Sequence, residues 1–247
     1  TSLAVFALAR VDRPRYSSNI ERGLRWLADN VNADGGWGDT PDSVSNMSTT
    51  ALCWSAFSIA DPAVYGKITG NAGRWLKTRS GSLDPADISA AIRNSYGEDR
   101  TFSAPILAMC ALAGRLGADG SAWQFVPQLP FELVVLPRKL FRLFRLSVVS
   151  YALPALIAIG LLRFTKSNNR LSFPGMLRKL CTGKSLEILA KLQPVNGGFL
   201  EATPLTSFVI MSLAGAGYSR HAVVEKGIGF LLAGVRDDGS WPIDTNL

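Results

Sequence analysis

The sequence predicts an all-α fold, and three observations lead to that prediction. Apolar residues recur at helical spacing along nearly all of the 247 residues. Short clusters of Gly, Pro, Asn and Asp separate these segments, and no stretch has the strict alternation of a half-buried strand. A helix with its loop takes roughly 17 residues, so we expect about a dozen helices.

Breaker and capping residues give approximate boundaries for each element. We expect helices at residues 2–10, 18–31, 47–60, 67–78, 85–95, 101–117, 131–145, 147–163, 173–181, 183–192, 203–216 and 220–234.

The segment 147–163 is uncharged before Arg163 and contains Pro154. We interpret it as a buried helix that kinks or begins at Pro154. A membrane-dipping segment and a spanning helix are alternatives, since its length is at the lower limit for crossing a bilayer.

Composition and charge limit the classes of molecule that the chain is expected to bind. Apolar residues make up 47% of the chain, which allows a sizeable core without disulfides or metal. The net charge of +7 is compatible with anionic lipid or nucleic acid. Because the basic stretch 138–184 alternates with apolar residues, as in PRKLFRLFRL, and forms no nucleic-acid-binding module, we expect lipid or solvent contact and no nucleic acid.

The metal-ligating residues are few and scattered. Cys53, Cys110, Cys181 and His221 form neither a CxxC nor an HxxxH pair, so we expect no metal and no cofactor. An odd, sparse set of cysteines is typical of a reducing compartment with buried thiols.

A repeat organises the chain. Residues 22–37, 184–199 and 226–241 superimpose without a gap, and residues 72–76 form a partial copy. Each full copy has a basic start, an aromatic residue or Ile followed by Leu, and then Gly and an aromatic at fixed spacing. Such repeats predict a helical array whose units share one core.

The repeat residues have structural roles. The glycine ends a helix or allows a tight turn with positive φ, and the closing aromatic covers a neighbouring helix end. A glutamine at the helix end satisfies orphan backbone groups, but Val31 and Val235 replace it in two copies. The structural residues that we predict are Trp26, Trp37, Gln193, Phe199, Phe230 and Trp241.

After each turn the chain is expected to enter another apolar helix, which Thr or Ser caps. MSTTALCWSAFSIAD follows the first turn and TPLTSFVIMSLAGAGYS follows the second. Only PIDTNL follows the third, and we interpret it as the opening of a further helix. The chain is therefore expected to be a fragment.

These repeats resemble the QW motif of the squalene-hopene and oxidosqualene cyclases, [K/R][G/A]xx[F/Y/W][L/I/V]xxxQxxxGxW. The resemblance covers nearly the whole chain, with Pro130-Phe131-Glu132 where the bacterial enzymes carry a Pro-Pro-Glu step. It implies an α/α barrel (toroid) like their N-terminal barrel over 1–219, and a last repeat with the start of a second barrel over 220–247. It also implies peripheral, monotopic attachment to the cytoplasmic side of a membrane.

The resemblance implies that the chain is part of a class II triterpene cyclase, which cyclises squalene or a similar polyprenyl chain after protonation by a DxDD acid. No DxDD occurs here, and Asp237-Asp238 belongs to a repeat turn. We therefore expect no catalytic residue and no activity in this segment alone. The alternative is a non-catalytic QW-repeat domain that binds an isoprenoid or a partner. A prenyltransferase β subunit, which shares the barrel, would need a zinc site.

The same resemblance suggests substrate-cavity positions. WPIDTNL aligns with a family stretch that has a Trp-Asp-Thr step at the cavity, and Ile243 takes the Trp position before Asp244. Ile106 takes the place of a second cavity Trp. For Asp244 a helix N-cap is an equal alternative.

Two segments have the composition of interfacial amphipathic helices, LPFELVVLPRKLFRLFRL and FPGMLRKLCTGK. The alternative is a barrel helix with a solvated basic face. A membrane surface is thus an expected partner, and a second copy of the chain is another candidate. The residues predicted to face lipid are Phe131, Leu140, Phe141, Phe144, Phe173, Met176 and Leu177.

Overall fold

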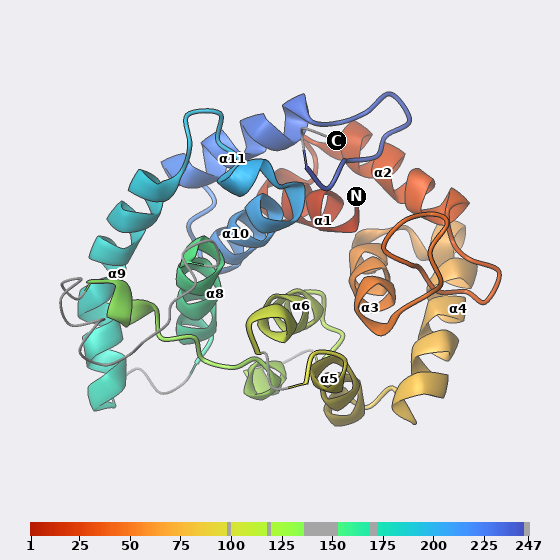
Figure 1. Cartoon of the computed structure of the whole chain (residues 1–247), viewed down its shortest axis with the longest axis horizontal. Helices are drawn as coiled ribbons and strands as arrows, with labels where there is room; N and C mark the ends of the chain where they lie inside the picture. The colour runs from red at the N-terminus through yellow and green to blue at the C-terminus, as the bar shows by residue number, and fades with distance from the viewer. Residues whose placement is uncertain (98–99, 118–119, 136–152, 168–171, 245–247) are drawn as a thin grey trace. The chain divides into compact units, whose positions relative to one another are not determined.

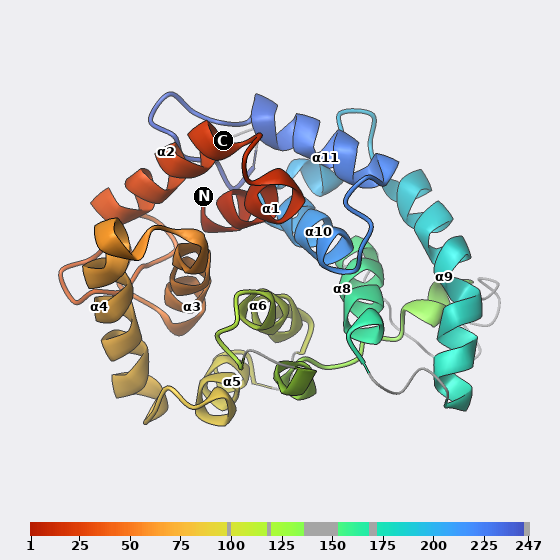
Figure 2. The same ribbon diagram turned by 180° about the vertical axis from the view of Figure 1, so that it is seen from behind.

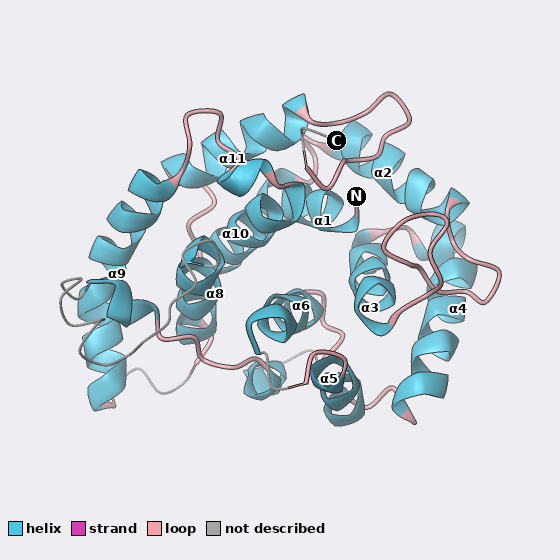
Figure 3. Cartoon of the chain, in the orientation of Figure 1, coloured by secondary structure: helices cyan, strands magenta, loops and turns pink. Residues whose placement is uncertain are grey.

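The computed structural model describes residues 1–97, 100–117, 120–135, 153–167 and 172–244 (Figure 1). Helices and their connecting loops make up these ranges, and none of them contains a β-strand (Figure 3). The predicted all-α class is therefore confirmed. Contacts divide the chain into two compact units, which are described separately.

Unit 1 comprises Thr1–Pro127 and Val235–Pro242, so a turn from the far end of the sequence belongs to it. Within it α3 packs against α1, α4 and α6, and Figures 1 and 2 both show α3 beside α4. Helix α1 is buried over residues 2–8, as expected of a helix that is apolar on all sides. Its elements are α1 (Ser2–Asp12), α2 (Ser17–Asp29), α3 (Met47–Ala56), η1 (Phe57–Ile59), α4 (Pro62–Ser80), α5 (Pro85–Asn94), α6 (Arg100–Leu112) and η2 (Gly120–Phe125).

Unit 2 comprises Gln128–Gly234 and Ile243–Leu247. Helix α10 packs against α8 and α11, and α9 packs against α8 and η3. Nearly all of α8 and α10 is buried, whereas α9 and α11 bury one face, so the unit pairs central with peripheral helices. Its elements are η3 (Phe131–Val135), α8 (Leu153–Thr165), α9 (Phe173–Leu192), η5 (Phe199–Glu201), α10 (Thr203–Gly215) and α11 (Ala222–Ala233).

Several boundaries differ from the expected ones for local reasons. Helix α4 begins at Pro62 rather than residue 67, because the Asp61 carboxylate accepts the Ala63 amide at 2.9 Å and proline suits the first helical turn. Helix α9 continues through Gly183, where two helices were expected. The short helix η2 was not expected.

The helix expected at 131–145 begins as the 3-10 helix η3, and residues 136–145 lie outside the described ranges. Helix α8 places Pro154 in its first turn, and the part of the expected segment before Leu153 is likewise outside them. Among the described helices, none combines the length and hydropathy that crossing a bilayer requires.

The expected boundary between a first barrel, residues 1–219, and the start of a second, residues 220–247, stays a prediction. In unit 2 the helices on the two sides of this boundary, α10 and α11, pack against each other.

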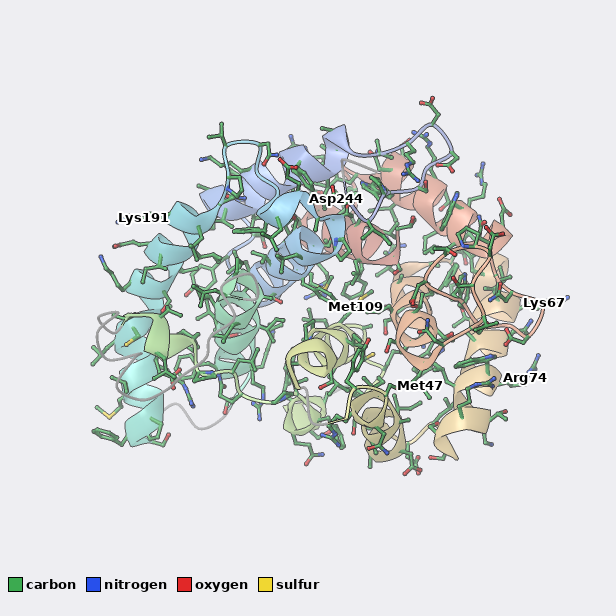
Figure 4. All side chains as sticks on the ribbon, viewed as in Figure 1. Met47, Lys67, Arg74, Met109, Lys191 and Asp244 are labelled. Carbon is green, nitrogen blue, oxygen red and sulfur yellow. The ribbon has the colours of Figure 1, made fainter. Side chains whose placement is uncertain are left out.

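The cores of the units consist of large apolar side chains such as Met109 of α6, which is fully buried (Figure 4).

Candidate functional site

The three repeat turns have one backbone geometry. Their glycines have φ near +90°, a conformation that L side chains rarely adopt. Each glycine amide donates to the carbonyl three residues earlier, and the next amide donates to the Asp or Asn side chain before the glycine. The triplets are Asp34-Gly35-Gly36, Asn196-Gly197-Gly198 and Asp238-Gly239-Ser240.

Each turn packs tightly against the helix of another repeat. A Cβ on Gly197 would lie 2.2 Å from the Lys226 carbonyl oxygen, and one on Gly239 would lie 2.9 Å from Arg22 Cβ. On Gly35 it would lie 3.1 Å from Asn71 Cβ. Since Lys226 and Arg22 are the first residues of repeat copies, Asn71 marks the same position in the partial copy on α4.

Side-chain hydrogen bonds reinforce this docking in unit 1. Trp26 Nε1 donates to Asp238 Oδ2 at 3.1 Å, and Trp75 Nε1 donates to Asp34 Oδ2 at 2.7 Å. The third turn also receives the Arg22 guanidinium, which donates to the carbonyl oxygens of residues 236 and 237.

The second turn uses a different pair at the same positions. Phe230 stands where the other docking helices have tryptophan, and Asn196 stands where the other turns have aspartate. Phe230 packs so closely that a Cβ on Gly198 would lie 2.3 Å from its ring. The two residues of each contact therefore vary together. In the first and third turns an indole N–H donates to a carboxylate, and in the second turn a phenyl ring packs against the backbone.

The closing aromatics attach each turn to a central helix. The amides of Trp37, Phe199 and Trp241 donate to the hydroxyls of Thr50, Thr206 and Thr1 at 3.0, 2.9 and 3.1 Å. These threonines lie on α3, on α10 and at the N-cap of α1. Helix α1 thus occupies, beside the third turn, the position that α3 and α10 occupy beside the others.

The residues after the third turn do not continue as a helix within the described ranges. The Ile243 carbonyl accepts the Thr203 amide at 3.0 Å, and Asp244 forms an isolated antiparallel bridge with Ala202. The helix that PIDTNL was expected to open would include residues 245–247, which lie outside the described ranges.

Gln193 makes two side-chain hydrogen bonds at the second turn. Its side-chain amide donates to the carbonyl oxygens of Gly197 and Val223, both at 2.9 Å, and so joins the turn to α11. The other predicted repeat aromatics Trp37, Phe199, Phe230 and Trp241 are buried, and Trp26 is half-buried.

The turn aspartates are held in their ionised form. Burial acts to raise the pKa of Asp34, but hydrogen bonds from Ser45, Trp75 and the Gly36 amide outweigh it and lower this pKa. Hydrogen bonding by Ser240, then by Trp26, lowers the pKa of Asp238. Neither carboxyl is therefore suited to donate a proton.

The three predicted cavity positions differ in environment. Ile106 is buried in unit 1, whereas Ile243 in unit 2 is 58% exposed. Asp244 (Figure 4) is half-buried. Their roles at a substrate cavity stay predictions.

The predicted lipid-facing residues separate into groups. Phe131 is fully buried and its ring lies 6.0 Å from that of Phe164, so the prediction that it faces lipid is wrong. The reason is that η3 packs into unit 2 against α8 and α9. Leu140, Phe141 and Phe144 lie outside the described residues.

Four apolar side chains on α9 are exposed and share one face. We call them the α9 stripe: Phe173, Met176, Leu177 and Leu180, with exposures of 83, 58, 45 and 82%. The first three were predicted. Leu180 was missed, although its spacing of seven residues from Phe173 places it on the same helix face.

The two fully buried cysteines are structural residues. Burial raises the pKa of the Cys53 thiol to about 12 and that of Cys110 to about 11, so both are protonated. In the part of the chain that the structure describes, no cluster of His, Cys, Asp and Glu could hold a metal ion.

Comparison of the sequence with models of known protein families gives no match, and comparison with curated proteins gives none either.

Proposed function

We propose that the chain is part of a class II triterpene cyclase of the squalene-hopene type and that its helices pair into an α/α barrel. One observation carries this proposal. Three turns with the spacing of QW motifs share one geometry, and each packs against the helix of another repeat copy. A shared turn with the same docking position at each copy is what a closed helical array needs.

The contacts of the third turn support the pairing of repeat elements that are far apart in the sequence. In unit 1 this turn lies against the first repeat helix, α2, and its closing Trp241 bonds to the cap of α1. Within unit 1, the turn that ends the last repeat thus contacts elements from the beginning of the chain.

The role proposed for this region is to support the reaction rather than to protonate the substrate. A class II cyclase needs a carboxylic acid that is protonated and poised to donate. The sequence has no DxDD motif, and hydrogen bonds lower the pKa of both turn aspartates. We therefore assign the protonating acid to neither of these aspartates.

We further propose that the α9 stripe enters the outer part of a lipid bilayer. Its side chains present apolar area to solvent at helical spacing, and Lys179 on α9 is exposed and suited to lipid phosphates. A substrate as apolar as squalene resides in the bilayer, so membrane attachment would bring the protein to it.

The complete protein that contains this sequence is the right material for the test. Incubated with squalene in detergent, it is expected to yield cyclised triterpenes detectable by gas chromatography and mass spectrometry. The 247-residue chain alone is expected to yield none. If the complete protein gives no cyclic product from squalene or from oxidosqualene, the proposal is wrong.

A second candidate is a non-catalytic QW-repeat domain that binds an isoprenoid or a protein partner. It is favoured by isoleucine at positions 106 and 243, where the family resemblance implies cation-stabilising tryptophans. Saturable binding of a squalene analogue by the complete protein, without turnover, would support this alternative.

A further inference from the structure

A groove of about 510 Å³ lies within unit 1 between α4 and the end of α3, and none of the three repeat turns lines it. Gly66, Gly70 and Gly73 form its floor on one face of α4. A Cβ on Gly66 or Gly70 would meet nothing within 4 Å, so the space above both is open. We call this the α4 groove, and its apolar walls are Trp54, Phe57, Tyr65 and Leu83.

Trp54 leaves a hydrogen-bond donor unused in this groove. Its side chain is only 7% exposed, and Nε1 has no acceptor among the described residues. A Cβ on Gly73 would lie 3.7 Å from Nε1, which places the N–H at the floor. This N–H opens to the groove, where a ligand that supplies an acceptor can take the place of water.

Cationic groups surround the same end of the groove. The Arg115 guanidinium lies 4.1 Å from the Trp54 ring centroid, and its Nε and Nη2 donate to the Trp54 carbonyl oxygen at 3.2 and 2.7 Å. Its Nη1 has no partner among the described residues. Lys77 lies one helical turn beyond Gly73, and Arg74 also lines the groove (Figure 4).

The acidic residue of the groove does not offset this charge at the Lys77 end. Asp61 lies at the start of α4, where its carboxylate accepts the Ala63 amide at 2.9 Å. The groove therefore has a cationic end with an indole N–H and, over Gly66 and Gly70, a less charged end that Asp61 borders. The two ends match the two parts of an amphipathic anion.

We propose that the α4 groove binds a small amphipathic anion, a single acyl or isoprenoid chain with a phosphate head. The head accepts hydrogen bonds from Trp54 Nε1 and Arg115 and pairs with Lys77, while the chain lies along Gly70 and Gly66. The volume is within the usual range of small-molecule sites. This site does not depend on the cyclase proposal.

Isothermal titration of the 247-residue chain with monomeric dodecyl phosphate tests the site. We expect saturable one-to-one binding, and binding at least about tenfold weaker for dodecanol and for inorganic phosphate, because each offers one part of the ligand. Trp54→Phe keeps the ring and removes the N–H, so we expect about tenfold weaker binding.

Gly70→Leu fills the groove with a better helix former, so binding should be lost while the melting temperature is kept or raised. Gly229→Leu on α11 is its matched control, since a Cβ there also meets nothing within 4 Å. Lys77→Gln should weaken binding, whereas Lys67→Gln, also on α4 (Figure 4) but outside the groove, should not.

The proposal is overturned if dodecyl phosphate binds equally well to the wild type, Trp54→Phe and Gly70→Leu, or does not bind at all. Vesicles of phosphatidylglycerol separate a free ligand from a lipid surface. If the protein binds vesicles but not monomeric alkyl phosphate, the cationic side chains contact a lipid surface instead. That result would also contradict the proposed ligand site.

Discussion

The indole N–H of Trp26 donates to the carboxylate of Asp238, a residue 212 positions later in the sequence, at 3.1 Å. The same contact joins Trp75 to Asp34 at 2.7 Å. One type of residue pair thus connects a turn to a docking helix at two places in unit 1. The repeated residues therefore make the same contact in more than one copy, which indicates that the repeat has a structural role.

The glycine of the second turn should tolerate no side chain. For Gly197→Ala we predict a loss of about 2 kcal/mol or more in the free energy of unfolding, since φ is +87° and a Cβ would lie 2.2 Å from the Lys226 carbonyl oxygen. Gly229→Ala on α11 is the control and should stabilise the protein by up to about 1 kcal/mol. Urea unfolding followed by circular dichroism measures both. Equal effects of the two substitutions would exclude close packing at Gly197.

The turn aspartates should make stability depend on acid. The pKa values of Asp34 and Asp238 are lowered below the ordinary 3.8 in the folded protein. Their contribution is therefore complete above the unfolded pKa and is lost as the pH falls through the folded pKa. We predict that the double variant Asp34→Asn, Asp238→Asn loses less stability than the wild type between about pH 5 and about pH 2.

Asparagine is a suitable replacement because Asn196 makes the same backbone contact in the second turn. Urea midpoints of wild type and double variant at several pH values give the comparison. Parallel pH profiles for the two proteins would show that these carboxylates are not held ionised by the fold.

Gln193 should contribute measurably to the second turn. For Gln193→Leu we predict a loss of about 1–2 kcal/mol, because the side-chain hydrogen bonds to the Gly197 and Val223 carbonyls are both lost. Gln124→Leu replaces an exposed glutamine and should change stability by less than about 0.5 kcal/mol. Thermal unfolding monitored at 222 nm separates the two outcomes, and an unchanged melting temperature for Gln193→Leu would count against the role.

Periodicity and breaker residues were sufficient to predict the all-α class, and the glycine spacing predicted the positive φ of the turns. The docking partners could not be predicted in the same way. Asn71 neither is basic nor precedes a glycine, so only Trp75 and Leu76 of the partial copy indicate that it takes the position of Arg22 and Lys226. The contact between Trp241 and Thr1 joins opposite ends of the chain, and only packing reveals it.

The lipid-facing residues show a similar limit. Helical spacing identified Phe173 and Met176 as candidates, but it also selected Phe131, which is fully buried. Composition alone cannot distinguish an apolar side chain that faces lipid from one that another helix covers. The sequence did not predict the α4 groove. Glycines spaced along one helix face do not show which residues pack opposite them, and only the structure places Trp54 there.

The α9 stripe should govern membrane binding. We predict that Phe173→Asp with Leu180→Asp reduces binding to vesicles of phosphatidylcholine and phosphatidylglycerol by about tenfold or more, because two apolar side chains no longer enter the bilayer. Val44→Asp with Val195→Asp is the matched control, since both valines are highly exposed and neither is part of α9. Co-sedimentation measures the bound fraction. Equal binding by both double variants would exclude the stripe as the attachment site.

A double-mutant cycle on Trp26 and Asp238 tests the central claim most directly, since it asks whether the third turn docks on the first repeat helix. The free energies of unfolding of Trp26→Phe, Asp238→Asn and the combined variant give the coupling between the two positions. We expect a coupling of about 0.5 kcal/mol or more, and near-zero coupling for Trp26→Phe with Asp34→Asn. Additive losses for Trp26 and Asp238 would contradict it.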